Sequence, residues 1–144
     1  MKHLTLQQHF DAPLDTVFRH FNRHDTFNTV LWPVRSVRII DSKDPGNPDG
    51  LGSVRQMGLG PIKPIREEIS ALEENRLIEY RMLANPLISH HVGRLVFSEE
   101  KGRTLLTYTI ESDSRFPLVP HMTLMQLKLS IKRGLKKVAK SFKA

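Results

Sequence analysis

The sequence predicts an α+β fold in which a curved antiparallel sheet packs against one long C-terminal helix. Between residues 34 and 113, apolar and polar residues alternate with a period of two, which is typical of strands. Short segments rich in Gly, Pro, Asn and Asp separate these strands, and such short connections favour antiparallel pairing. After Pro120, apolar residues recur at helical spacing over the rest of the chain.

The N-terminal segment is expected to form a strand followed by two short helices. The strand covers residues 3–10. A helix then begins within Asp11-Ala-Pro-Leu-Asp15, because proline suits a first turn and aspartate suits the positive end of the helix dipole. A second helical stretch over residues 23–31 ends at Trp32, since the residue before Pro33 disfavours the helical conformation. The apolar face of the first helix consists of Leu14, Val17, Phe18 and Phe21.

A meander of six strands follows in the middle of the chain. Its predicted strands are Val34–Asp41, Gly52–Leu59, Ile65–Leu72, Arg76–Leu83, Ser89–Ser98 and Arg103–Asp113.

The last predicted element is one long amphipathic helix. One side carries the apolar residues Leu124, Leu127, Ile131, Leu135, Val138 and Phe142, and the other side carries Lys128, Lys132, Arg133, Lys136, Lys137, Lys140 and Lys143. We expect one domain over residues 1–144, because no linker, repeat or low-complexity segment interrupts the chain.

Composition and charge exclude several classes of protein. The chain has no cysteine, which removes disulfides, thiolate zinc sites and cysteine nucleophiles. No apolar run reaches the length of a membrane span, and the first ten residues do not resemble a signal peptide, so a cytoplasmic protein is expected. The net charge of +7 is localised: every acidic residue lies at or before Asp113, whereas residues 114–144 contain eight Lys and Arg residues. Because the excess positive charge is confined to this segment, it does not indicate that the entire protein binds a polyanion.

Several short motifs occur in order along residues 3–142. They are Phe10-Asp-Ala-Pro-Leu-Asp-Thr-Val-Phe18, Trp32, Gly50-Leu-Gly-Ser-Val-Arg55, Arg66-Glu-Glu-Ile69, Arg76-Leu-Ile-Glu-Tyr80, Gly93 and Thr104-Leu-Leu-Thr-Tyr108. With the element order, they resemble the START-related superfamily of polyketide cyclases, dehydrases and lipid-transport proteins (SRPBCC, Bet v 1-like). The resemblance implies a helix-grip fold and a cavity between sheet and long helix for an apolar or aromatic small molecule. Because the superfamily shares no linear catalytic signature, no catalytic residue is carried over.

Strand alternation places five polar side chains on the predicted inner face of the sheet. These are Arg55, Glu67, Tyr80, His91 and Tyr108. A buried polar group needs a hydrogen-bond partner or a ligand, so each is a candidate ligand contact. A purely structural alternative is an Arg–Glu pair with two tyrosine hydroxyls at the sheet edge. The full set of predicted ligand contacts adds Trp32, Met57, Ile69, Met82 and Ile110.

Neither a metal nor a cofactor is expected. His20 and His24 stand four residues apart, but no nearby motif supplies a clear third ligand. Gly50-Leu-Gly52 begins like a dinucleotide fingerprint, yet Arg55 occupies the position of the third glycine and a strand follows. His90 and His91 are adjacent in a strand and point to opposite faces, and the apolar pattern favours His91 as the inward one.

Three functions remain open. The preferred one is binding of a hydrophobic small molecule in a cavity of about 300 to 1,000 Å³. The second is an enzyme, such as a cyclase, dehydratase or hydrolase, in which His91 or Glu67 transfers protons and Arg55 or Tyr108 stabilises negative charge. The third is a nucleic-acid or membrane-surface module built on the basic helix. We expect that helix face to be merely solvated, with no nucleic-acid partner and no stable membrane insertion. Oligomeric state is left open.

Overall fold

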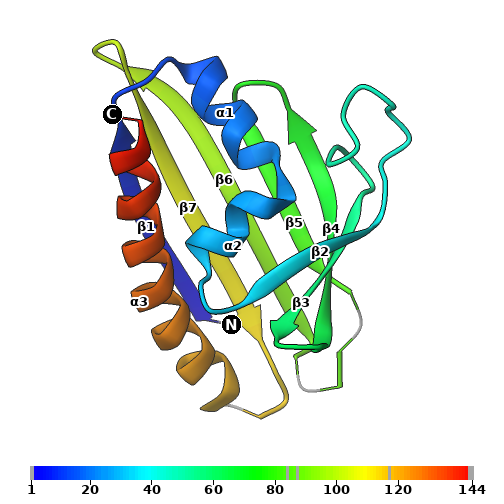
Figure 1. Ribbon diagram of the computed structural model, residues 1–144. Coiled ribbons are helices and arrows are strands. Elements are labelled where there is room, and N and C mark those ends of the chain that lie inside the picture. Colours follow the sequence, from blue (N-terminus) through cyan, green and yellow to red (C-terminus); the bar gives the residue numbers. More distant parts are fainter. Residues whose placement is uncertain (1, 84, 87, 117, 143–144) are drawn as a thin grey trace.

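The computed structural model of the protein describes residues 2–83, 85–86, 88–116 and 118–142. Within these residues, seven strands form one antiparallel sheet in the order β1-β7-β6-β5-β4-β3-β2 (Figure 1). The strands are β1 Lys2–Phe10, β2 Arg35–Ile40, β3 Val54–Leu59, β4 Ile62–Glu73, β5 Leu77–Met82, β6 His90–Glu100 and β7 Arg103–Asp113. The helices are α1 Leu14–Asn22, the 3-10 turn η1 His24–Thr26, α2 Phe27–Val30 and α3 Leu118–Ser141.

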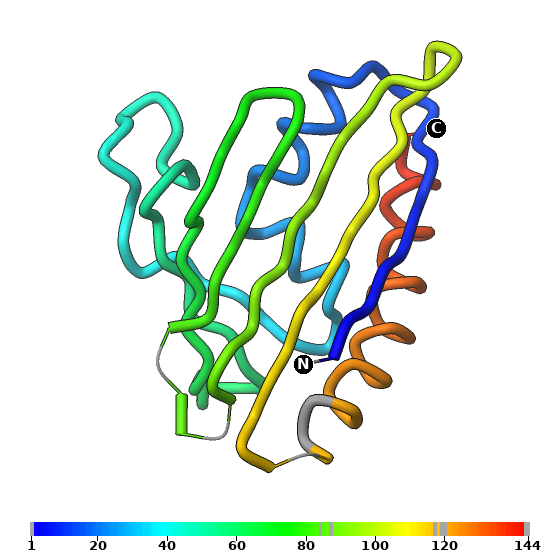
Figure 2. The backbone as a smooth tube through the Cα atoms, turned by 180° about the vertical axis from the view of Figure 1, so that it is seen from behind, coloured from blue at the N-terminus to red at the C-terminus, as the bar shows by residue number. Residues whose placement is uncertain are grey.

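The helices cover the sheet as the helix-grip prediction requires. Figure 1 shows α1 and α2 crossing one face of the curved sheet, and α3 running beside β1. Seen from behind in Figure 2, α3 again follows the edge of the sheet at β1. Packing contacts join α3 to β1, to β7 and to α2. The α+β class and the predicted order of elements are therefore confirmed.

Several boundaries differ from the predictions by a few residues; for example, β4 begins at Ile62 instead of Ile65, and β6 extends to Glu100 instead of Ser98. Two differences concern the helices. The long helix begins at Leu118, before Pro120. Proline is tolerated there because the first backbone N–H groups of a helix have no intrahelical acceptor. The second short helix is divided into η1 and α2, and it ends before the Trp32–Pro33 peptide, which is cis.

A close approach of two backbones fixes α2 against α3. A side-chain carbon at Gly134 of α3 would overlap the backbone of Val30 at the end of α2. Glycine is therefore required for this contact. Next to it, Val30, Ile131 and Leu135 are almost completely buried. The contact holds the short η1–α2 segment over the sheet, which matters for the site described below.

The predicted faces of α3 are confirmed, with one addition. Leu124, Ile131, Leu135 and Val138 are buried, Leu127 and Phe142 are half-buried, and the predicted cations from Lys128 to Lys140 are exposed. Lys143 lies outside the described residues. The exposed side also carries Leu118, Met122, Met125 and Leu129, which the sequence pattern did not assign. No helix in the described part of the chain is both long and apolar enough to span a membrane.

Candidate functional site

Five polar side chains lie together on the concave face of the sheet, one on each of five neighbouring strands. They are Arg55 of β3, Glu67 of β4, Tyr80 of β5, His91 of β6 and Tyr108 of β7, and we call them the polar cluster. Each residue is at most 5% exposed. Alternation had predicted all five to face inward, and their burial confirms that orientation.

Arg55 and Glu67 form a buried ion pair. They are direct partners in the β3–β4 register, and the Glu67 Oε1 atom accepts hydrogen bonds from Arg55 Nη2 at 2.9 Å and Nε at 3.2 Å. The guanidinium carbon also lies 4.1 Å from the ring centroid of Phe27 and 4.8 Å from that of Tyr80. Aromatic faces attract a guanidinium, so α2 and β5 both help to hold this charge.

The two tyrosines meet at their hydroxyl groups. Tyr80 and Tyr108 hydrogen-bond to each other, and their rings lie edge to face with centroids 6.3 Å apart. Burial raises the pKa of both phenols, so both are neutral at ordinary pH. The Tyr80 ring occupies the space that a side chain at Gly93 would fill on the neighbouring strand. Glycine at this position therefore allows Tyr80 to lie across β6.

His91 completes the polar cluster at its β6 side. Its Nδ1 atom lies 3.3 Å from Ser112 Oγ, and its ring is 6.5 Å from the ring of Tyr80. Burial lowers the pKa of His91 below 6.5, although the negative charge of Glu67 partly opposes this effect. The imidazole is therefore neutral near pH 7, where it can accept a hydrogen bond or a proton.

This lowered pKa predicts an acid-sensitive fold. The unfolded chain binds the His91 proton more tightly than the folded protein does, so the stabilising contribution is complete above about pH 6.5 and is lost as the pH falls below it. In urea titrations, the free energy of unfolding of the wild type should decrease between about pH 7 and about pH 5. The decrease should be smaller in His91→Gln. His90→Gln, on the opposite face, should retain the full decrease. If His91→Gln has the same pH dependence as the wild type, the lowered pKa of His91 is not the cause of the acid sensitivity.

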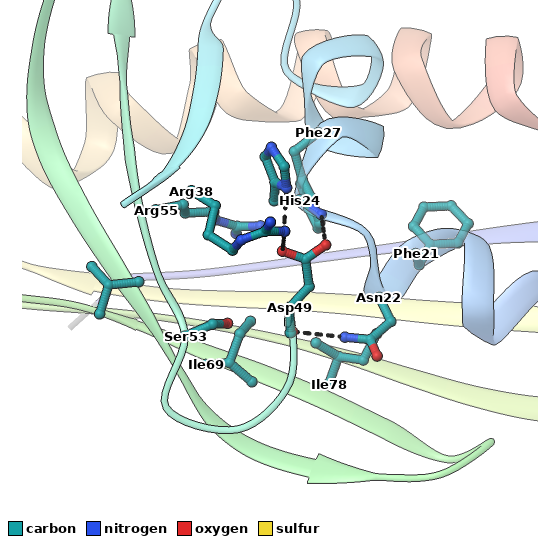
Figure 3. A pocket seen from close by; sticks show the side chains of 11 residues that line it. Phe21, Asn22, His24, Phe27, Arg38, Asp49, Ser53, Arg55, Ile69 and Ile78 are labelled. Atoms are coloured by element: carbon teal, nitrogen blue, oxygen red, sulfur yellow. Dashed lines mark hydrogen bonds and ion pairs between the residues drawn. The ribbon is translucent and has the colours of Figure 1, made fainter. Parts of the chain in front are cut away.

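Among the described residues, the space beside the polar cluster is nearly filled. The enclosed space beside Arg55 has a volume of about 10 Å³, and Phe21, Phe27, Ile69 and Ile78 line it with the Arg55 side chain (Figure 3). Such a volume accommodates about one water molecule. The expected cavity of about 300 to 1,000 Å³ is therefore corrected: in this conformation Phe27 and the Arg55 side chain occupy the space above the sheet.

A second polar group borders the same space, and the sequence did not reveal it. Asp49 Oδ1 accepts from Arg38 Nη1 at 2.7 Å and lies 3.2 Å from His24 Nδ1 (Figure 3). Its Oδ2 atom accepts from the His24 backbone N–H, and the Asp49 carbonyl accepts from Asn22. Burial alone would raise the pKa of Asp49, but the hydrogen bonds from Arg38 and His24 hold it below its usual value. This group anchors the loop at residues 44–50 to η1 and β2.

The histidines considered as metal ligands have separate roles. His24 binds Asp49, whereas the ring of His20 packs 5.3 Å from that of Phe142. Across the described ranges, no group of three His, Asp or Glu side chains is placed to hold a metal ion.

The remaining predicted contacts divide between core and surface. Met57, Ile69 and Ile110 are buried in the hydrophobic core and Met82 is half-buried. Trp32 is 54% exposed and lies under the Arg35 guanidinium, 5.9 Å from ring centroid to carbon, so it does not join the polar cluster.

An open groove lies on the other side of α1. It has a volume of about 1,110 Å³ and is formed by α1, the loop at residues 44–47, the β4–β5 turn and Phe142. Its walls are largely polar side chains such as Asp15, Arg19 and Arg23. A larger share of its lining residues is polar than in the space beside Arg55.

Comparison with known proteins agrees with the fold. The whole chain, residues 1–144, matches the family model described as polyketide cyclase / dehydrase and lipid transport. No curated protein sequence matches the chain. The structure is similar to that of a protein from Nitrosospira multiformis, at 16% identity, with 98% of this chain and 96% of that chain covered and a TM-score of 0.70.

Two further solved structures show the same fold. A protein from Thermus thermophilus is 16% identical, with 98% of this chain and 96% of that chain covered and a TM-score of 0.71. Major latex-like protein 151 from Panax ginseng is 16% identical, with 96% and 97% covered and a TM-score of 0.67. Such low identities establish a shared fold alone, whereas the family match spans the whole sequence. The chain therefore belongs to the polyketide cyclase/dehydrase and lipid transport family.

Proposed function

We propose that the protein binds a hydrophobic or aromatic small molecule on the concave face of its sheet, with the polar cluster orienting one polar group of that molecule. One observation carries the proposal: five buried polar side chains from five adjacent strands converge beneath the short segment that holds Phe27. Family membership supports the same conclusion, since the family includes lipid-transport proteins.

The chemistry of the cluster favours recognition over stability. A buried ion pair contributes little net stability, because desolvation of the two charges offsets most of their attraction. Apolar residues at Arg55 and Glu67 would fill the same space without that penalty. The pair, the tyrosine hydroxyls and the neutral His91 instead supply donors and acceptors for a carbonyl, hydroxyl or carboxylate on an otherwise apolar molecule.

Entry of such a molecule requires the η1–α2 segment to move, because the present cavity is too small. The segment consists of a three-residue turn and a four-residue helix, and neither has a side-chain hydrogen bond at its N-cap. Helices this short depend on tertiary contacts for their stability. Displacement of Phe27 would uncover the Arg55 guanidinium and the Tyr80 ring together.

The direct test is native mass spectrometry of the purified protein, combined with titration of the fluorescent dye 1-anilinonaphthalene-8-sulfonate. We expect one bound small molecule per chain, and dye binding that the co-purified molecule displaces. The double variant Arg55→Met/Glu67→Leu should fold but bind neither molecule. A matched control is Arg94→Met/Glu79→Leu, which removes a 2.8 Å Arg–Glu pair from the opposite face of the same sheet. Equal loss of binding in both variants would contradict the proposed location.

A single hydroxyl provides a finer test. Tyr108→Phe removes one neutral hydrogen-bonding group from the cluster. We expect a loss of about 0.5 to 1.5 kcal/mol in ligand affinity by calorimetry, which is roughly 2- to 10-fold in Kd. Thr107→Val, on the other face of β7, should leave affinity unchanged. A loss far above this range for Tyr108→Phe would indicate that the hydroxyl does more than orient the ligand.

An enzyme in the same site is the second candidate, and the neutral His91 imidazole favours it. A neutral imidazole near Glu67 is able to take up a proton from a bound substrate. In that case the identified ligand would be converted by the wild-type protein. Turnover should then fall by about 100- to 10,000-fold in His91→Ala or Glu67→Gln, while binding persists. A ligand that changes neither in mass nor in chromatographic retention supports binding alone.

A further inference from the structure

The outward face of α3 has two unlike halves. Its N-terminal half presents an apolar row at helical spacing, which we call the outer stripe: Leu118, Met122, Met125 and Leu129. These four residues are between 58% and 72% exposed. At about 1.5 Å per residue, the stripe extends for about 16 Å along the helix. Phe116, just before the helix, is exposed as well. Exposed apolar rows of this length are typical of surfaces that bind another molecule or a membrane.

The C-terminal half of the same face is cationic. Its basic patch consists of Lys132, Arg133, Lys136, Lys137 and Lys140. Together with Leu129, these side chains line a shallow surface depression of about 470 Å³. No acidic residue occurs after Asp113 in the sequence, so nothing on this helix neutralises the patch. The partner of this face should therefore be apolar at one end and negatively charged at the other.

We propose that the outward face of α3 is not merely solvated, as the sequence had led us to expect, but docks on the surface of a membrane containing anionic phospholipid. The outer stripe would enter the boundary between headgroups and acyl chains, and the basic patch would contact the phosphates. Long lysine side chains suit this arrangement, because their stems lie along apolar surface while the ammonium groups stay with the headgroups. Since the described chain has no membrane-spanning helix, the docking is peripheral and reversible.

Other partners fit this face less well. A nucleic acid would use the basic patch but leave the outer stripe exposed, and α3 offers no aromatic platform on that stripe for stacking bases. A protein partner is disfavoured because lysine is depleted in the centres of protein interfaces, and four of the five cations in the patch are lysines. The surface is also separate from the proposed ligand site, since none of its residues lines the space beside Arg55.

The test is co-sedimentation of the full chain with phosphatidylcholine vesicles, with and without phosphatidylglycerol. We expect binding only when phosphatidylglycerol is present, and weaker binding at high salt. The triple variant Lys132→Gln/Lys136→Gln/Lys140→Gln should lose roughly 100-fold in affinity. The triple variant Met122→Ser/Met125→Ser/Leu129→Ser should lose at least about 10-fold. All six positions are exposed, so each variant should fold, and thermal unfolding is the measurement that checks this.

Matched controls use similar residues elsewhere on the surface. Lys2→Gln/Lys43→Gln/Lys101→Gln and Val37→Ser/Ile40→Ser remove exposed lysines and exposed apolar residues outside α3, and both should bind as the wild type does. Met125→Glu is a single-site variant that should also abolish vesicle binding. The proposal is overturned if the wild type ignores phosphatidylglycerol vesicles, or if controls and α3 variants lose affinity equally. A nucleic-acid partner would be indicated, and the proposal overturned, if polyuridylic acid displaces the vesicles while Met122→Ser/Met125→Ser/Leu129→Ser keeps full vesicle affinity. A second copy of the chain would be indicated, with the same consequence, if light scattering shows a dimer for the wild type and a monomer for that variant.

Discussion

Arg55→Met is expected to lower the free energy of unfolding by about 3 to 5 kcal/mol, because it leaves the Glu67 carboxylate buried without its counter-charge. The double variant Arg55→Met/Glu67→Leu should recover to within about 1 kcal/mol of the wild type, since it removes both buried charges. Urea unfolding monitored by circular dichroism measures both values.

The control for this prediction is Arg94→Met, on the opposite face of the sheet. Arg94 pairs with Glu79 and Glu111, but its side chain is 35% exposed. Solvent screens such pairs, so the loss should be about 1 kcal/mol or less. If Arg55→Met costs no more than Arg94→Met, removal of Arg55 does not leave an uncompensated buried charge at Glu67, and the prediction is wrong. If the double variant at Arg55 and Glu67 does not recover, the ion pair stabilises the fold itself and its assignment to ligand recognition fails.

Ile131→Ala should lower the free energy of unfolding by about 2 to 5 kcal/mol, because it opens a cavity where α3 meets the core. Ile131 is 0% exposed, whereas Leu129, two residues earlier on the same helix, is 72% exposed. Leu129→Ala is therefore the matched control, and its effect should stay below about 0.5 kcal/mol. Comparable losses from the two variants would show that α3 presents a different face to the sheet.

Strand alternation predicted the inward side chains of the sheet because the strands remain regular where those residues lie. The β3–β4 register shifts only after Met57, and the β4–β5 register shifts only after Ile69. Arg55 and Glu67 thus keep the orientation that a period of two requires. The bulge in β4 lies between Ile62 and Ile65, ahead of the regular stretch that contains Glu67, so it leaves the inward orientation of Glu67 unchanged.

Features that depend on tertiary contacts were not predictable in this way. The position of Phe27 over Arg55 follows from the contact between Gly134 and Val30, which joins segments far apart in the sequence. The filling of the expected cavity has the same origin. The anchoring of Asp49 by Arg38 and His24 likewise joins a loop, a strand and a short turn, and no local pattern records it.

The outer stripe is a different case, since its signal was present in the sequence. Leu118, Met122, Met125 and Leu129 have helical spacing, as do the residues of the buried face. A helix with two apolar stripes does not indicate by itself which of them packs on the sheet. The contacts of α3 with β1, β7 and α2 decide the question.

The central claim is that a ligand binds on the concave face of the sheet, above the polar cluster and beneath the η1–α2 segment. Amide chemical-shift mapping tests it most directly, with the molecule identified by mass spectrometry, or with 1-anilinonaphthalene-8-sulfonate if none co-purifies. We predict the largest shifts at Arg55, Glu67 and Tyr80 together with Phe27, the residue that must move. Shifts confined to the open groove beside α1, at residues such as Arg19, Arg23 and Asn75, would contradict the claim.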